Sequence, residues 1–64
     1  MQNRPRVGER VQVRWGFEDE QGEVFRVEGK GEKTWVTVEL FLDGSEEPTL
    51  ATYLLNEVRP AQAA

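Results

Sequence analysis

The side chains that most often carry out chemistry in proteins are missing from this 64-residue chain. It contains no cysteine, which excludes disulfides, thiolate metal sites and thiol redox chemistry. It contains no histidine, so the commonest general base and the commonest nitrogen ligand of zinc are missing as well. Carboxylates alone could bind a hard cation, but the sequence has no Asp-x-Asp-x-Asp-Gly loop. We therefore expect no catalytic residues, no metal site and no cofactor.

The charged residues are distributed unevenly along the chain, whose formal net charge is −4. The first 14 residues hold four arginines, Arg4, Arg6, Arg10 and Arg14, against one acid, Glu9. The remaining residues hold eleven acids and four bases. A protein that neutralises phosphates needs an excess of positive charge, so the overall balance disfavours nucleic acid as a partner. The charges serve either to keep a small domain in solution or to form a local arginine strip.

The sequence predicts that β-strands position any functional side chains. In residues 34–42, four aliphatic residues alternate with Trp35, Thr37, Glu39 and Phe41. Period-two alternation places the two sets on opposite faces of an extended strand, and the β-branched and aromatic content favours a strand over a helix. We expect this segment to be the longest and central strand, with its aliphatic set in the core.

Shorter patterns surround this segment. Residues 10–15 predict a strand with Val11, Val13 and Trp15 on one face and three solvated polar residues on the other. Residues 16–22 predict a loop, because two glycines bound it and three consecutive acids repel one another. The other predicted elements are a strand at 23–28 with a β-bulge near Phe25, a hairpin turn at 29–31, a turn at 43–48, a strand at 49–53, a helical turn at 54–57 and a last strand at 58–59, ended by Pro60.

Five short strands with tight turns, and one helical turn before the last strand, predict an all-β fold: a small five-stranded SH3-like barrel. Closing the sheet on itself hides strand edges and gives a short chain one compact core. The barrel is expected to span residues 7–60, between flexible tails at residues 1–6 and 61–64. The expected core residues are Val11, Val13, Val24, Val27, Val36, Val38, Leu40, Leu50, Leu54 and Val58.

The N-terminal half of the chain resembles a KOW motif. That motif is Gly-Asp/Glu-x-Val-x-Val, a glycine and an aromatic residue, then Gly-x-Val-x-x-Val, which residues 8–17 and 22–27 follow. The resemblance extends more loosely to Arg59, with strand–turn–strand spacing similar to the C-terminal domain of NusG-type transcription factors. The chain also resembles Tudor-type domains, for instance those appended to bacterial helicases. The resemblance implies a non-catalytic protein-interaction module, accessory to transcription, translation or DNA repair.

The resemblance also implies where a partner would bind. KOW domains contact RNA or ribosomal and polymerase-associated proteins, and Tudor domains often bind peptides, some through an aromatic cage, in both cases with loops at one end of the barrel. An aromatic ring beside a carboxylate attracts Lys or Arg. We therefore expect a basic or aromatic peptide of a partner protein to bind Trp15, Phe17, Glu18, Asp19, Glu20 and Tyr53. The alternative is that Trp15 and Phe17 plug the open end of the barrel.

Trp35 and Phe41 are a second candidate patch, because they lie on the face opposite the aliphatic set of their strand. One interpretation is that the strand curves and that the turn at residues 54–55 or the tails cover its ends. The other is an exposed apolar patch for a partner or for self-association.

Two further function classes stay open. A nucleic-acid-binding KOW-like domain would use Arg4, Arg6, Arg10 and Arg14, with Trp35 or Phe41 stacking on bases. An enzyme is the third class, since type II plasmid dihydrofolate reductases build a pore from four SH3-like protomers. That family carries Gln-Ile-Tyr where this chain has Ala-Thr-Tyr at residues 51–53, so only Tyr53 matches.

No apolar run approaches the roughly 20 residues of a membrane span. The first residues also lack the apolar core of a signal peptide. We therefore expect a cytoplasmic protein.

Overall fold

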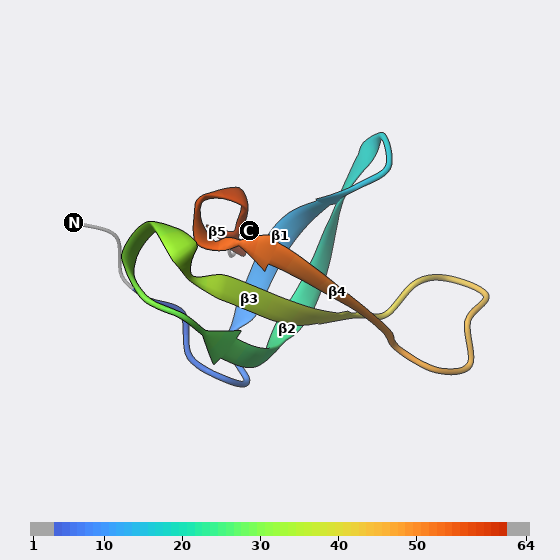
Figure 1. The fold of residues 1–64 in the computed structure, drawn as a ribbon. Coiled ribbons are helices and arrows are strands. Elements are labelled where there is room, and N and C mark those ends of the chain that lie inside the picture. The colour runs from blue at the N-terminus through green and yellow to red at the C-terminus, as the bar shows by residue number, and fades with distance from the viewer. Residues whose placement is uncertain (1–3, 62–64) are drawn as a thin grey trace.

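The structure of the protein is a computed structural model, and it describes residues 4–61. Within them, strands and two short 3-10 turns follow one another along the chain (Figure 1). The strands are β1 (Arg10–Trp15), β2 (Glu18–Glu28), β3 (Trp35–Leu40), β4 (Thr49–Leu54) and β5 (Arg59–Pro60), and the turns are η1 (Gly31–Lys33) and η2 (Leu55–Glu57). The predicted all-β class, with five strands and a helical turn before the last, is confirmed.

The strands form one antiparallel sheet in the order β4-β3-β2-β1-β5. Strand β2 lies at its centre, because its first half pairs with β1 and its second half with β3. It is also the longest strand, with 11 residues against six in β3. The prediction that residues 34–42 form the central and longest strand is therefore wrong. The aliphatic alternation does mark β3, but β3 lies between β2 and β4.

The predicted loop at residues 16–22 is also wrong, because β2 begins at Glu18. Gly16 and Phe17 form a two-residue turn, and Trp15 and Glu18 pair on either side of it. Gly16 has a φ of +65° and Phe17 does not have a positive φ, which is the combination of a type II′ hairpin turn. Strand geometry places Asp19 on the face opposite Glu18 and Glu20, so adjacent acids in the sequence point away from each other.

The predicted β-bulge near Phe25 is confirmed. The register of the β2–β3 pairing shifts between Val24 and Arg26, so Phe25 is the extra residue. The bulge lets both Val24 and Val27 lie on the core side, where Val24 is fully buried and Val27 is half-buried. On the outside, the Arg26 guanidinium carbon lies 6.0 Å from the centre of the Phe25 ring.

One face of the sheet forms the core. The buried apolar side chains are Val11, Val13, Val24, Val36, Val38 and Leu40. Two of the predicted core residues, Leu50 and Leu54, lie on the opposite face, and Leu50 is 53% exposed. Strand β4 instead turns Ala51 and Tyr53 toward the core. The register explains the correction, because Ala51 pairs with Val38 and Tyr53 with Val36, both fully buried.

The connection between β2 and β3 is longer than the predicted turn at residues 29–31, because it includes η1. Gly29 and Gly31 have φ angles of +93° and +54°, so the positive φ expected there is confirmed. A Cβ atom at Gly29 would collide with the carbonyl oxygen of Lys33, so the position requires glycine. The buried Thr34 closes the connection, with its hydroxyl donating to the Gly31 carbonyl oxygen at 2.8 Å.

The C-terminal segment returns the chain to β1. The N–H of Leu55 in η2 donates to the carbonyl oxygen of Thr34 at 2.9 Å. Strand β5 then pairs with β1, one residue later than predicted and with Pro60 inside the strand. Among residues 4–61, no strand pairing joins β4 to β5. The sheet is therefore open, and the predicted barrel is confirmed only as a five-stranded antiparallel sheet.

The predicted tails lie partly outside the described residues, which exclude 1–3 and 62–64. The guanidinium group of Arg4 donates to the Gly29 carbonyl oxygen at 3.2 Å. At the other end, the N–H of Ala61 donates to the carbonyl oxygen of Arg10 at 3.3 Å.

Candidate binding site at the β1–β2 hairpin

The ladder between β1 and β2 gives this hairpin two faces of different chemistry. Residues directly opposite each other in an antiparallel pair lie on the same face. The core-side pairs are Val11 with Gly22, Val13 with Glu20 and Trp15 with Glu18. The outer pairs are Arg10 with Glu23, Gln12 with Gln21 and Arg14 with Asp19. Toward the tip, the core-side face therefore changes from buried valines to an aromatic ring with two carboxylates.

Both aromatic residues of the hairpin are accessible. Phe17 lies in the turn and is 97% exposed, while Trp15 is 39% exposed. A side chain as exposed as Phe17 does not plug the end of a core. In Figure 1 the tip of the β1–β2 hairpin projects away from the paired strands β3 and β4. The hairpin thus presents an uncovered Phe17 ring beside a partly covered Trp15 ring.

Tyr53, which was expected beside these residues, has a different role. It lies on β4 opposite Val36 and packs half-buried against the core. Its hydroxyl donates to the carbonyl oxygen of Arg14 at 2.9 Å. Burial, together with the nearby charge of Glu57, raises the pKa of Tyr53 above its ordinary value of 10.0. The ring of Tyr53 therefore packs on the core and its hydroxyl holds the backbone of β1, and the structure does not place Tyr53 on the exposed surface of the hairpin.

The three acids of the hairpin are divided between its faces. The Asp19 carboxylate lies 3.8 Å from the Arg14 guanidinium group, in an ion pair that is exposed on both sides. The Nε of Arg14 also donates to the carbonyl oxygen of Gly16 at 3.3 Å. Glu18 and Glu20 lie on the other face and have no ion-pair partner among residues 4–61. Their charges are therefore free to act beside Trp15.

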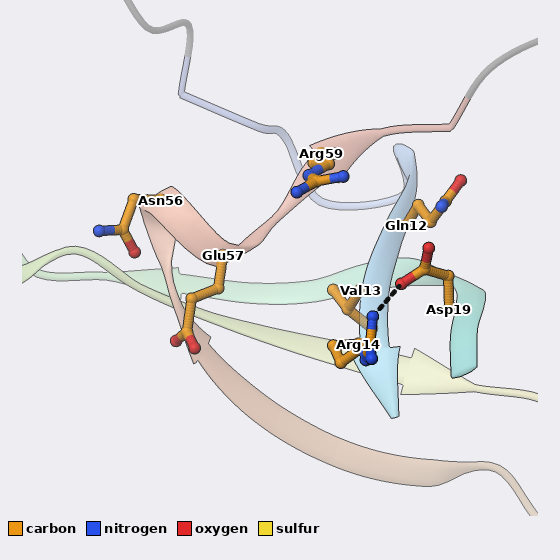
Figure 2. Close-up of a pocket in the computed structure, with 7 residues that line it drawn as sticks. All are labelled: Gln12, Val13, Arg14, Asp19, Asn56, Glu57 and Arg59. Carbon is orange, nitrogen blue, oxygen red and sulfur yellow. Dashed lines mark ion pairs between the residues drawn. The ribbon is translucent and has the colours of Figure 1, made fainter. Parts of the chain in front are cut away.

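A polar groove lies beside the hairpin, between β1, η2 and β5 (Figure 2). Its volume is about 370 Å³, and it is lined by Gln12, Val13, Arg14, Asp19, Asn56, Glu57 and Arg59. Figure 2 shows Arg14 turned toward Asp19, with Glu57 on the far side of the groove. The Glu57 carboxylate accepts a hydrogen bond from the N–H of Leu54 at 3.0 Å. Two guanidinium groups balance two carboxylates here, so the groove selects neither cations nor anions by charge.

The groove was missed in the sequence because its two sides come from distant segments. Residues 12–19 and 56–59 meet through the pairing of β5 with β1. That pairing joins residues 49 positions apart, Val11 and Pro60, and no local pattern marks it. The nearest local signal was the cluster of polar residues Asn56, Glu57 and Arg59 around Val58.

The second predicted patch does not form one surface. Trp35 is 48% exposed and lies opposite Leu54 of β4 at the start of β3. Phe41 is 58% exposed and follows the last residue of β3, where it lines a small hollow with Arg10 and Gln21. The two rings are therefore at opposite ends of the strand.

The predicted arginine strip is partly neutralised by acids. Arg14 forms the ion pair with Asp19, and Arg10 lies opposite Glu23 in the ladder. Arg4 is held by a backbone carbonyl oxygen at the β2–β3 connection. A phosphate approaching β1 would therefore meet carboxylates beside two of the four arginines.

Among the residues that the structure describes, no group of three or more acids is placed to hold a metal ion. None of the helical segments in that part of the chain has the length and hydrophobicity that a membrane crossing needs. No family model, curated protein or solved structure matches this chain, so a function for it rests on the geometry of the hairpin itself.

Proposed function

We propose that this protein is a non-catalytic interaction module whose β1–β2 hairpin binds a basic segment of a partner protein. The observation that carries the proposal is the 97% exposure of Phe17 at the tip of an ordered hairpin. Trp15 and the carboxylates of Glu18 and Glu20 lie next to it on one face of the same hairpin. This arrangement offers an apolar contact and a cation site within a few residues.

The pairing of Trp15 with Glu18 suits a cationic side chain. The face of an indole ring attracts Lys or Arg by about 0.5–1 kcal/mol at an exposed site, and a carboxylate adds Coulomb attraction. The two residues are direct cross-strand neighbours, so the ring and the carboxylate are held near each other before binding. Less conformational entropy is then lost on association, which favours affinity.

Phe17 supplies the apolar part of the contact. Moving a Phe side chain from water into a partner's surface contributes about 1.5–3 kcal/mol. The two-residue turn fixes the backbone that carries the ring, because Trp15 and Glu18 pair directly on either side of it. Phe17 is therefore the residue whose removal should weaken binding most.

The fold proposed for this module is an SH3-like barrel of the KOW or Tudor type. The strand order, the bulge in β2 and the η2 turn before β5 support this proposal. The hydrogen bond from the Tyr53 hydroxyl to the Arg14 carbonyl oxygen links β4 to β1 across the open side of the sheet, which β4 and β5 border. On the resemblance alone, the partner would act in transcription, translation or DNA repair.

Nucleic acid is the competing partner class. The acids beside Arg10 and Arg14, and the free carboxylates at the hairpin tip, count against it. Salt separates the two classes, because phosphate binding weakens steeply with ionic strength and a contact based on Phe17 does so less.

The test is a titration of the ¹⁵N-labelled protein with the basic peptide Gly-Lys-Arg-Tyr-Lys-Gly, followed by nuclear magnetic resonance. We expect the largest shifts at the Trp15 indole N–H and at the amides of residues 15–20. Phe17→Ala should weaken binding at least about tenfold, which corresponds to 1.4 kcal/mol. Phe41→Ala is the matched control, because it removes an exposed aromatic ring outside the hairpin.

Equal affinities for the wild-type protein and Phe17→Ala would refute the hairpin site. A ten-residue oligothymidylate that binds more tightly than the peptide, and that dissociates as salt is added, would move the function to nucleic acid.

A further inference from the structure

We infer that the outer edge of β4 accepts an extended, basic peptide segment of a partner protein as an additional strand. This surface shares no residue with the β1–β2 hairpin and does not depend on the function proposed for that hairpin. It concerns Thr49–Leu54, which form the last strand on one side of the sheet.

The hydrogen bonds at the end of β4 show which of its N–H groups are free. The N–H of Leu55 points to β3, since it donates to Thr34, whereas the N–H of Leu54 points away and donates to Glu57. Successive N–H groups of a strand alternate in direction. The N–H groups of Leu50 and Thr52 therefore point away from β3, as does that of Leu54. Both Leu50 and Thr52 are exposed.

This edge lacks the features that keep edge strands from pairing. Proteins protect such edges with charged side chains, prolines, bulges or very short strands. Strand β4 is Thr-Leu-Ala-Thr-Tyr-Leu: six residues without a charge, a proline or a glycine. Its pairing with β3 is regular along its whole length. Among residues 4–61, no other strand pairs with it.

The outer face of β4 adds apolar contacts for an incoming strand. Leu50 is 53% exposed, and Leu54 lies two positions beyond Thr52 on the same face. Leu54 is paired with Trp35, whose ring is 48% exposed. A strand laid along β4 would place alternate side chains next to Leu50 and next to Leu54 with Trp35.

Charge decides what kind of strand fits. Residues 34–58 contain five acids and neither Lys nor Arg. The acids are Glu39, Asp43, Glu46, Glu47 and Glu57. Two of them, Glu46 and Glu47, precede β4, and Glu57 follows it in the groove that also contains Arg59, so the acidic excess is greatest at the Thr49 end of the edge. A second copy of the chain in antiparallel pairing would bring Glu46 and Glu47 close to the other copy's Glu57 and would be repelled. A basic segment is attracted, most strongly by Glu46 and Glu47.

The probe for this inference is the peptide Lys-Lys-Val-Thr-Val-Lys-Lys, which has a strand-forming centre and basic ends. Its binding is followed by amide hydrogen exchange of the ¹⁵N-labelled protein. We expect the amides of Leu50 and Thr52 to exchange at least about tenfold more slowly with the peptide bound, because they gain hydrogen bonds. Two control peptides replace every Lys with Glu, or the central Thr with Pro, and each should bind at least about tenfold more weakly.

Two variants separate this edge from the hairpin. Leu50→Lys places a charge on the edge and should weaken peptide binding at least tenfold, while folding is retained because Leu50 is exposed. Leu50→Thr is its matched control, since it keeps a strand-forming residue without adding charge. Phe17→Ala should leave the peptide-induced protection of the Leu50 and Thr52 amides unchanged, so failure of the hairpin proposal would not affect this readout.

Three outcomes would overturn the inference. The first is a shift confined to residues 15–20, which would assign the peptide to the hairpin. The second is equal affinity of the peptide for Leu50→Lys and the wild-type protein. The third is protection of the Leu50 and Thr52 amides as protein concentration rises without peptide, which would make a second copy the occupant.

Discussion

The two edges of the sheet are built in opposite ways. Strand β5 is two residues long and consists of Arg59 and Pro60, so it presents a charge and one residue that has no N–H to donate. Strand β4 is six residues long and has neither charge nor proline. A short, charged edge gives another chain little to pair with, whereas a long neutral edge is a template. The β5 side of this sheet is therefore closed to further strands, whereas the β4 side is open.

The edges also differ in how they are attached. Strand β4 pairs with β3 over six positions and places Ala51 and Tyr53 on the core. Strand β5 pairs with β1 over two positions, Val11 with Pro60 and Gln12 with Arg59. The open edge therefore belongs to the firmly held strand, which is the condition for accepting a partner without unfolding.

The largest expected effect concerns the attachment of β4. Leu40 is fully buried and lies opposite Thr49, the first residue of β4. Leu40→Ala should lower the free energy of unfolding by about 2–5 kcal/mol, measured by urea denaturation, because it removes core contacts and leaves a cavity. Leu50→Ala, on the exposed face of β4, should cost less than about 1 kcal/mol. Equal costs for the two variants would contradict the face assignment of β4.

The next effect concerns the side-chain link between β4 and β1. Tyr53→Phe removes the hydrogen bond to the Arg14 carbonyl oxygen and should lower the free energy of unfolding by about 1 kcal/mol at neutral pH. Burial and Glu57 raise the pKa of Tyr53, so the folded protein holds the phenolic proton more tightly than the unfolded chain does. This stabilisation is complete below pH 10 and is lost as the pH rises through the raised pKa.

The pH profile provides the control for this prediction. The wild-type protein should lose stability above pH 10 more steeply than Tyr53→Phe, with unfolding followed by tryptophan fluorescence. Parallel profiles for the two proteins would show that the Tyr53 proton is not linked to folding.

A smaller effect is expected from Glu57→Ala, which would add a third free N–H group to the open edge of β4. The Glu57 carboxylate occupies the N–H of Leu54, so Glu57→Ala should free that group. We expect a loss of about 0.5 kcal/mol, at the low end for a lost cap, and faster hydrogen exchange at Leu54. Exchange at Ala51 should stay slow because its N–H points to β3. An unchanged exchange rate at Leu54 would argue against the hydrogen bond to Glu57.

The smallest expected effect lies on the β1 side, near the protected edge. Asp19→Asn removes the exposed ion pair with Arg14 and should change the free energy of unfolding by no more than about 0.3 kcal/mol. A thermal melt at two salt concentrations measures it. A loss above about 1 kcal/mol would mean that this pair holds the hairpin together, contrary to its exposure.

Local alternation predicted most of the fold correctly. The patterns at residues 10–15 and 34–42 identified β1 and β3, because each strand buries only one face. The predictions for residues 18–20 and for the inward face of β4 were wrong, because each pattern fits two structures. Residues 18–20 looked like a loop because adjacent acids repel, but strand geometry separates them onto two faces. In β4, either Leu50 and Leu54 or Ala51 and Tyr53 could face inward, and pairing with β3 selected the second pair.

The candidate site was recognisable only in part. Trp15 and Phe17 stand next to the acids in the sequence, so local inspection found them. The contact of Tyr53 with the hairpin could not be read locally, because it depends on the face that β4 turns to the core and on a carbonyl group 39 residues away. The open edge of β4 was also missed, since strand order is set by long-range pairing. In the sequence, only the absence of Lys and Arg from residues 34–58 pointed to this edge.

The pairing of β5 with β1 also has a consequence for folding kinetics. The β1–β2, β2–β3 and β3–β4 pairs each join neighbouring strands through short connections, so they can form early. Joining Val11 to Pro60 instead requires the two ends of a 49-position separation to meet. The earlier pairs order most of the intervening chain, so this contact is expected to form after them, when β1 and the end of β4 are already held close together. Strand β5, the shortest in the sheet, is therefore expected to limit how fast the protein reaches its final structure.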